Sequence, residues 1–259
     1  MLEDCLSATA VTDNLKTRFI GRPLVYYPAL ATTMAEAGQA ARQGAVEGTV
    51  ILADEQTEGR GRLGRRWLSP RGNVAFSVVL RPGRAELPSL IMLAALAVVR
   101  SLRAVTGLDG QVKWPNDVLI NGRKVCGILT ESALKEATVD YAIIGIGLNV
   151  NLPAADLAGI TPAATSLAVE LGRAVPRRDL ICRLLLEMEQ LYLSLRGGGS
   201  LYQEWRDNLV TLGKPVRVTV GRVVYEGVAE DVARDGRLRL RQPDGRMVDI
   251  TAGDVTLRE

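Results

Sequence analysis

Hydrophobic and polar positions change their spacing several times along the chain, and each change predicts an element. Short apolar or alternating runs predict strands at 24–27, 48–53, 73–80, 112–114, 124–131 and 138–150. Apolar residues at helical spacing predict helices at 32–42, from Pro88 onward, at 179–196 and at 201–209. The turn pair Asn121-Gly122 predicts a hairpin between two of the strands. The mixture of strands and helices predicts an α+β core.

The pattern changes at Gly213. Four or five short strand-like runs follow within fewer than fifty residues, separated by the turn pairs Asp235-Gly236 and Asp244-Gly245. Such a series is typical of a small antiparallel β-barrel. We therefore expect two domains, a mixed one over residues 1–212 and an all-β one over residues 213–259.

Composition excludes several classes of function. The chain has 259 residues with 32 Lys and Arg, 29 Asp and Glu, and no histidine. The net charge of +3 provides no basic field for nucleic acid, and the lack of histidine excludes a Ser-His-Asp triad and His-ligated zinc. Residues 213–259 alone hold nine basic and eight acidic side chains, so this segment does not resemble a nucleic-acid reader either.

Cysteine usage and the N-terminal residues predict a cytoplasmic location. Cys5, Cys126 and Cys182 are widely spaced without a C-x-x-C pair, which favours reduced thiols over a disulfide or metal framework. The first twenty residues have neither the basic start nor the apolar run of a signal peptide. The longest apolar stretch, Leu90 to Val99, is half of a membrane span, so no membrane association is expected.

The segment GRGRLGRRW, residues 59–67, is the first candidate for chemistry. Its three glycines allow close backbone approach to a ligand, and its four arginines supply positive charge without an acidic interruption. An anion such as a phosphate or carboxylate suits this segment. On composition alone, a flexible basic loop is an equally good reading. The spacing is that of neither a P-loop nor a dinucleotide-binding turn.

Three further segments stand out, although each has an ordinary structural explanation. KWPND, residues 113–117, is a strand end and turn that presents amide and carboxylate groups. KVCGILTE, residues 124–131, is a strand with one lysine at its start. GIGLNVN, residues 145–151, has glycines alternating within a strand, which often marks a surface that a ligand crosses.

Taken together and in this order, the four segments resemble those of the bacterial biotin protein ligases. ATTMAEA (31–37), DEQTEGRGR (54–62) and ATSLAVELG (164–172) support the resemblance, which runs from about residue 24 to the C-terminus. It implies a mixed-sheet catalytic core related to class II aminoacyl-tRNA synthetases and lipoate ligases, followed by a small Src-homology-type barrel. It also implies ATP, magnesium carried with ATP rather than held by protein ligands, and biotin as substrate.

The resemblance implies a reaction in two steps. Biotin and ATP form biotinyl-5′-AMP and pyrophosphate, and biotin then passes to one lysine of a biotin carboxyl carrier domain. The implied catalytic charges are Lys124, Arg62 and Arg60. The implied biotin-binding residues are Thr32, Thr33, Met34, Gln56, Arg60, Gly61, Arg62, Lys124, Gly127, Gly145 and Gly147. The implied ATP and adenylate residues are Arg65, Trp67, Lys113, Asn116, Asp117 and Asn149.

The resemblance also assigns larger segments. The Gly-Arg segment would close over the ligand, residues 152–164 would form a lid over the adenosine, and Gly145 and Gly147 would make a flat floor beneath it. Thr32-Thr33-Met34 departs from the Ser-Thr-Asn or Ser-Thr-Met frequent in the family, but threonine retains the hydroxyl group. About twenty residues precede the first core strand, so we expect a ligase without a DNA-binding repressor domain. A homodimer is compatible with this fold.

Two alternatives stay open from the sequence. A lipoate ligase or octanoyltransferase shares the core fold, but that group usually shows an Arg-rich, triple-Gly motif followed by His-Asp. A nucleic-acid-binding protein would use the Gly-Arg segment and the terminal barrel, although the segment lacks interleaved aromatic residues.

Overall fold

The computed structural model describes residues 6–160 and 163–257, and its strands form two sheets. The larger sheet has seven strands in the order β1-β2-β3-β7-β6-β5-β4. Only β1 and β2 pair in parallel, so the sheet is mixed. Its strands are β1 (Leu24–Tyr27), β2 (Val50–Ala53), β3 (Val74–Leu80), β4 (Gln111–Lys113), β5 (Asp117–Ile120), β6 (Arg123–Lys135) and β7 (Thr138–Leu148).

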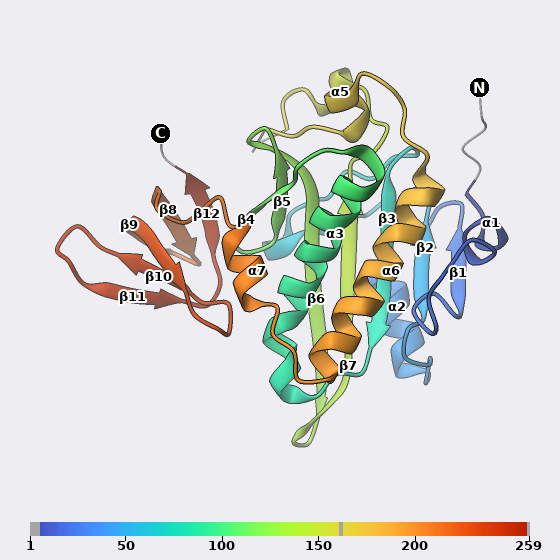
Figure 1. Ribbon diagram of the computed structural model, residues 1–259, viewed down its shortest axis with the longest axis horizontal. Coiled ribbons are helices and arrows are strands. Elements are labelled where there is room, and N and C mark those ends of the chain that lie inside the picture. The colour runs from blue at the N-terminus through green and yellow to red at the C-terminus, as the bar shows by residue number, and fades with distance from the viewer. Residues whose placement is uncertain (1–5, 161–162, 258–259) are drawn as a thin grey trace.

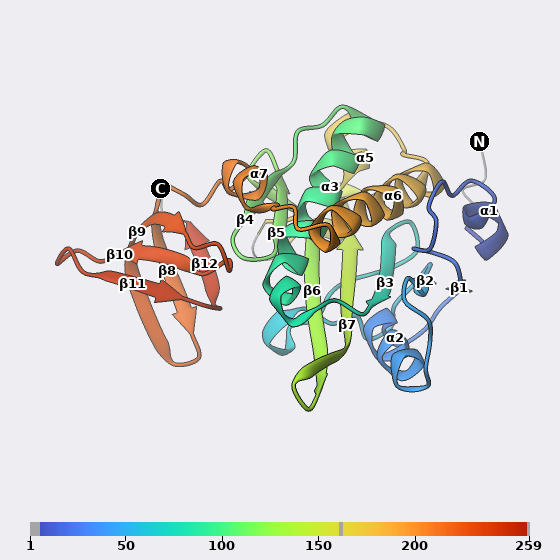
Figure 2. The ribbon, with the colours of Figure 1, turned by 60° about the horizontal axis from the view of Figure 1, so that its bottom comes forward.

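Helices cover this sheet unequally, as Figures 1 and 2 show. The long helices α3 (Leu90–Thr106) and α6 (Arg177–Arg196) pack together over one face, and α2 (Thr33–Arg42) packs on β2, β3 and β7. Because α2 is short, part of its face of the sheet stays open. Shorter helices connect these elements: α1 (Ala8–Thr12), η1 (Arg62–Gly64), η2 (Arg84–Ser89), α4 (Ala154–Leu157), α5 (Leu167–Leu171) and α7 (Tyr202–Asp207).

The two faces of the sheet bury separate apolar clusters. Val74, Phe76 and Val78 of β3 point toward the buried faces of α3 and α6 in the large cluster. Alternate residues point to the other face, where Met34 and Ala37 of α2 pack on Ile51, Val79 and Ile143. The alternation along β3 therefore places Ala75 and Ser77 on the face that α2 covers only in part.

The continuous helical run Arg84–Thr106 is long and apolar enough to cross a membrane by length and composition. It is longer than the strictly apolar stretch noted in the sequence because helix α3 continues past Val99. In its most apolar window 56% is buried inside the protein. Leu93, Leu96 and Leu102 are fully covered there, which is the pattern of a core helix.

The second sheet has the order β11-β10-β9-β8-β12 and is antiparallel throughout. Its strands are β8 (Pro215–Val220), β9 (Val223–Val232), β10 (Leu238–Arg241), β11 (Met247–Ile250) and β12 (Asp254–Leu257). The expected antiparallel all-β unit is therefore confirmed. Within the described residues, β11 and β12 are the two edges of one open sheet.

The second sheet is joined to the core by buried contacts beside β4 and α7 (Figure 1). The indole Nε1 of Trp114, which is 1% exposed, donates a hydrogen bond of 2.8 Å to the carbonyl of Gly236. Tyr202 donates its hydroxyl to the carbonyl of Val232 at 2.7 Å, and Arg206 pairs with Asp231. Two hydrogen bonds from aromatic side chains and one ion pair thus hold the second sheet against the core.

Most predicted elements are present, with differences at their ends. The hairpin at Asn121-Gly122 is confirmed, with φ of 50° and 74° at the two turn residues, as its turn type requires. Pro88 lies in the preceding 3₁₀ turn rather than at the first turn of α3, which begins at Leu90. The sequence pattern does not separate β5 or the short helix α1 as elements.

Candidate active site

A row of small residues crosses the partly open face of the large sheet. Strand register places Ala53 beside Ala75, Ala75 beside Gly147, and Gly147 beside Gly127. The next register partners are Asp117 and then Lys113, so the row ends in charged side chains. Because the first four residues have little or no side chain, the row forms a shallow trough across four strands.

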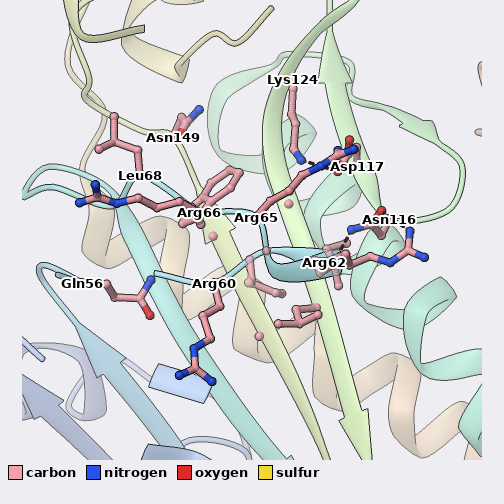
Figure 3. A pocket seen from close by; sticks show the side chains of 18 of the residues that line it. Gln56, Arg60, Arg62, Arg65, Arg66, Leu68, Asn116, Asp117, Lys124 and Asn149 are labelled. Carbon is pink, nitrogen blue, oxygen red and sulfur yellow. Dashed lines mark hydrogen bonds and ion pairs between the residues drawn. The ribbon is translucent and has the colours of Figure 1, made fainter. Parts of the chain in front are cut away.

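A cavity of about 280 Å³ lies over this trough, and the predicted site residues gather around it (Figure 3). Its lining includes Thr32, Thr33, Met34, Gln56, Arg60, Gly61, Arg62, Arg65, Trp67, Asn116, Asp117, Lys124, Gly127, Gly145, Gly147 and Asn149. These residues come from α2, several strands and the Gly-Arg segment, far apart in sequence. Of the residues proposed from the sequence, Lys113 does not line the cavity. It lies one strand farther out, paired with Asp117.

The Gly-Arg segment folds into a closed hairpin loop. The amide of Trp67 donates to the carbonyl of Gly59 at 2.8 Å, and the amide of Gly61 donates to that of Arg65 at 2.8 Å. Glycine is required at position 59, since a Cβ atom there would lie 2.3 Å from the Trp67 carbonyl oxygen. The turn at the tip has Leu63 with a φ of 56°. The backbone thus brings four arginines around one small loop.

Positive charge is concentrated at one end of the cavity. The Nζ atom of Lys124 lies 2.6 Å from Oδ1 of Asp117. Arg62 donates to Oδ1 of Asn116 at 3.2 Å and to the carbonyl of Gly253 at 3.3 Å. Burial lowers the pKa of the Arg62 guanidinium, which nonetheless stays charged near neutrality. Figure 3 shows the Arg60 guanidinium directed away from Lys124, so these two predicted catalytic charges face different parts of the cavity.

The opposite end of the cavity carries neutral polar side chains, and in Figure 3 the Arg60 guanidinium lies on the same side as Gln56. Oε1 of Gln56 accepts hydrogen bonds from the amide of Thr33 at 2.8 Å and from its hydroxyl at 3.1 Å. The hydroxyl of Ser77, fully buried on β3, donates in turn to the Thr33 hydroxyl at 2.8 Å. This chain of donors fixes the Gln56 amide, leaving its Nε2 hydrogens to donate to a ligand.

The segment predicted as a lid is attached beside Lys124. The amide of Lys124 donates to the carbonyl of Ala163 at 2.9 Å, and the amide of Thr165 donates to the carbonyl of Lys124 at 2.8 Å. The apolar side chains of Leu152, Leu157 and Ile160 line the cavity. Residues 161 and 162 of the predicted lid lie outside the described residues.

Asn149 anchors this segment. Its Nδ2 donates to the carbonyl of Thr165 at 3.0 Å, and its Oδ1 accepts from Asn73 at 3.4 Å. The side chain lines the cavity, but both ends of its amide contact protein. Contact with a nucleotide, as expected from the sequence, stays a prediction.

Comparison with known proteins agrees with this geometry. Residues 32–149 match the model of the biotin/lipoate A/B protein ligase family, and residues 211–258 match the biotin protein ligase C-terminal domain. The bifunctional ligase/repressor of Bacillus subtilis is 36% identical over 97% of this chain and 79% of its own length. The chain belongs to the biotin protein ligase family.

Two other proteins of the family are also similar to this chain. The biotin–[acetyl-CoA-carboxylase] ligase of Mycobacterium tuberculosis is 38% identical over 81% of this chain and 79% of its own length. The biotin protein ligase of Aquifex aeolicus, solved in complex with biotin and ATP, superposes with a TM-score of 0.75. That structure is 28% identical in sequence and covers 91% of this chain and 98% of its own.

Several residues of this ligase site were not predicted from the sequence. Asp254, from the start of β12, lines the cavity and forms an ion pair with Arg65. Arg66 and Leu68, next to predicted residues, also line it, while Ser77 supports it from beneath. Local signals exist for Arg66 within the Gly-Arg segment. None exists for Ser77 or Asp254, whose places depend on strand register and on the position of the second sheet.

Proposed function

We propose that this biotin protein ligase activates biotin with ATP and transfers the biotinyl group to a lysine of a biotin carboxyl carrier domain. The observation that carries the proposal is the polarity of one cavity. Gln56 and Thr33 present neutral hydrogen-bonding groups at one end, and Lys124 and Arg62 present cations at the other. Biotin has a neutral cyclic urea at one end and a carboxylate at the other, and so matches this order.

In the first step, a biotin carboxylate oxygen bonds to the α-phosphorus of ATP, and the bond from that phosphorus to pyrophosphate breaks. Two anions must approach each other, which is unfavourable without nearby positive charge. Lys124 and Arg62 offset this repulsion and stabilise the charge that develops on the transferred phosphoryl oxygens. Their positions are fixed before the reaction by Asp117 and Asn116.

In the second step, the ε-amine of the carrier lysine attacks the acyl carbon of biotinyl-5′-AMP. The bond from that carbon to the phosphate oxygen breaks, AMP leaves, and the amine nitrogen gives up a proton. The anhydride must be protected from water until the carrier arrives. The Gly-Arg loop and the apolar side chains of residues 152–160 lie around the cavity where they can exclude water.

The residues present fit a magnesium ion that arrives on the nucleotide. No cluster of three or more potential ligands occurs among residues 6–160 and 163–257. The two carboxylates lining the cavity, Asp117 and Asp254, are each paired with a cation. Magnesium bound mainly by phosphates and water is common in nucleotide sites, where it neutralises phosphate charge. Of these two carboxylates, Asp117 is the one that we propose would contact this magnesium ion.

The finer assignments are part of the same proposal. Residues 1–212 form the catalytic domain and residues 213–259 the terminal domain. The carrier is the biotin carboxyl carrier protein of acetyl-CoA carboxylase or a related carboxylase, and the enzyme acts in the cytoplasm. The family model covers both biotin and lipoate ligases, so lipoate is the acid against which biotin must be tested.

The decisive experiment is acid-dependent exchange of labelled pyrophosphate into ATP in the presence of magnesium, with biotin or lipoate as the acid. Exchange with biotin alone supports the proposal. Exchange with lipoate would reassign the protein to the lipoate branch, and no exchange with either acid would overturn the proposed activity. Labelling of a purified carrier domain, but not of its Lys→Arg variant, tests the second step.

A further inference from the structure

Three glycines lie in the floor of the cavity, and each faces a side chain from another element. Gly127 on β6 and Gly147 on β7 are direct register partners. Gly145 precedes Gly147 by two residues and points to the same face of the sheet. The resemblance implies that Gly145 and Gly147 make a flat floor beneath the ligand. All three glycines line the cavity, and a protein side chain also lies against each of them.

The indole of Trp67 lies on the Gly127–Gly147 pair. A Cβ atom at Gly147 would lie 2.4 Å from Nε1 and 2.5 Å from Cε2 of Trp67, and one at Gly127 would lie 3.0 Å from Cζ3. The contacts at Gly147 are closer than a Cβ atom can approach, so even an alanine there would force the rigid ring to move, and at Gly127 the ring would have to shift slightly. At Gly147 the three nearest atoms all belong to Trp67.

Packing holds this indole, because no hydrogen bond fixes it. Nε1 of Trp67 is buried, and among the described residues it has no hydrogen-bond partner. The other specific contact of the ring is with Nζ of Lys124, 5.3 Å from the ring centroid. A methyl group added at Gly147 would therefore displace the ring.

Gly145 likewise leaves room for a side chain, that of Met34. A Cβ atom there would lie 2.5 Å from Sδ and 3.0 Å from Cγ of Met34. Met34 follows Thr33 in α2, at the neutral end of the cavity. Trp67 follows the Gly-Arg loop and lies beside Lys124, at the cationic end. Adjacent same-face positions of β7 thus carry side chains that belong to opposite ends of the cavity.

We propose that Gly145 and Gly147 are positioning residues that separately set the acid-binding and nucleotide-binding halves of the cavity. Gly147, with Gly127, seats the Trp67 indole as a wall of the nucleotide half, and Gly145 seats Met34 in the acid half. The names of the two halves rest on the proposed function, whereas the packing of Trp67 on Gly147 and of Met34 on Gly145 does not. Gly127 has a further effect, because a Cβ atom there would also lie 3.4 Å from Nζ of Lys124.

The packing of Trp67 and Met34 on these glycines is tested first, without substrate. Gly147→Ala, Gly145→Ala and the exposed control Gly83→Ala are each compared with the same variant carrying Trp67→Phe, so that the difference spectrum reports Trp67 fluorescence. In Gly147→Ala we expect Trp67 emission at longer wavelength and stronger quenching by acrylamide, because the lifted ring meets water. Gly145→Ala and Gly83→Ala should retain the wild-type Trp67 signal. A wild-type Trp67 fluorescence signal in Gly147→Ala would overturn the proposal that Gly147 positions the indole.

The division of the cavity is then tested by pyrophosphate exchange. Gly147→Ala should raise the KM for ATP about tenfold or more, an overpacking effect, while the KM for biotin changes less than about twofold. Gly145→Ala should show the reverse, with a smaller effect because the end of Met34 is flexible. Equal changes in both constants in both variants would overturn the division. Absence of exchange in the wild-type protein would overturn the proposed function but leave the fluorescence result valid.

A double variant keeps the proposal testable if Gly147→Ala does not fold. Because only Trp67 atoms lie nearest to the added methyl group, Gly147→Ala should have little effect on stability in a Trp67→Leu background. The double variant is expected to fold and to match Trp67→Leu alone in melting temperature. A further loss of stability in the double variant would show that the backbone itself requires glycine. It would contradict the proposal that Gly147 serves to make room for the Trp67 ring.

Discussion

The Nζ atom of Lys124 lies 2.6 Å from Oδ1 of Asp117, on the neighbouring strand β5, and 5.3 Å from the centroid of the Trp67 ring. Both side chains of the ion pair are mostly covered, at 21% and 16% exposed. An ammonium group held in this way points at the cavity without a search among rotamers, so its charge is already in place when the substrates bind.

Replacing Lys124 by glutamine should slow biotinyl-5′-AMP formation by roughly 10²–10³, as loss of one charge-stabilising donor does in other enzymes. The measurement is pyrophosphate exchange at saturating biotin and ATP. Lys135→Gln, an exposed lysine at the far end of the same strand, is the matched control and should exchange normally. A near-normal rate in Lys124→Gln would remove this lysine from its proposed role.

Arg62→Gly should give an enzyme that releases its adenylate. The Arg62 guanidinium joins the Gly-Arg loop to Asn116 and to the carbonyl of Gly253, and glycine makes neither contact. We expect free biotinyl-5′-AMP in the filtrate and biotin on lysines of a bystander protein. Retention of the adenylate together with no bystander labelling would contradict this role.

Lys113 lies one strand outside the cavity, and a nucleotide that extends past Asp117 to reach it should show an alkaline limit on its use. Burial lowers the pKa of Lys113, as do the positive charges of Lys124 and Arg65, while Asp117 and Asp254 act in the opposite direction. It therefore loses its proton at lower pH than an ordinary lysine, and kcat/KM for ATP should fall as the pH rises through that lowered pKa. Lys113→Arg keeps its charge to higher pH and should move the falling limb upward. A pH profile with the same alkaline limb in both proteins would exclude Lys113 from nucleotide binding.

Asp254→Asn should loosen the Gly-Arg loop with little effect on overall stability. The ion pair with Arg65 is partly exposed, so its loss costs about 0–1 kcal/mol of unfolding free energy. Trypsin cleavage at the loop arginines should become faster, and biotin with ATP should slow it again. Asp244→Asn, which removes an exposed pair with Arg246 in the same sheet, is the control. Equal cleavage of Asp254→Asn and the control would show that the Asp254–Arg65 pair does not hold the loop.

Deleting residues 213–259 is a less informative test of the second sheet. The deletion would remove the partner of the buried Trp114 indole as well as Asp254. A buried donor left without its partner costs about 1–3 kcal/mol. Loss of activity in the truncated chain would therefore mix a destabilised core with an altered site.

The sequence predicted the elements well where a single periodicity persists, and less well at their ends. Helix α6 begins at Arg177, directly after Pro176, whereas the apolar stripe that starts at Leu180 predicted a start at Asp179. Residues 177–179 are charged, so an apolar pattern does not detect this turn, although Arg177 is buried and pairs with Asp54. Strand β5 is short and directly follows a turn, and therefore leaves no alternation of its own.

The site was predictable where its residues lie in compact local motifs. Arg62, Asn116 and Lys124 belong to such motifs, and the fold brings them together. Ser77 has no local signal, because its importance comes from facing Gly145 across β3 and β7. Asp254 is 189 residues from Arg65 in sequence, and only the junction of the two sheets makes them neighbours.

The pairing of Lys124 with Ala163 and Thr165 has a consequence for how this enzyme can change. One end of the candidate lid is held by both peptide groups of the lysine, and the other by the Ser166 hydroxyl bonded to the Leu152 carbonyl at 2.6 Å. Between two such anchors the intervening stretch can lengthen at small entropic cost, since loop closure depends only weakly on length. A change in the length of this stretch can therefore alter the space above the cavity without moving the ammonium group of Lys124.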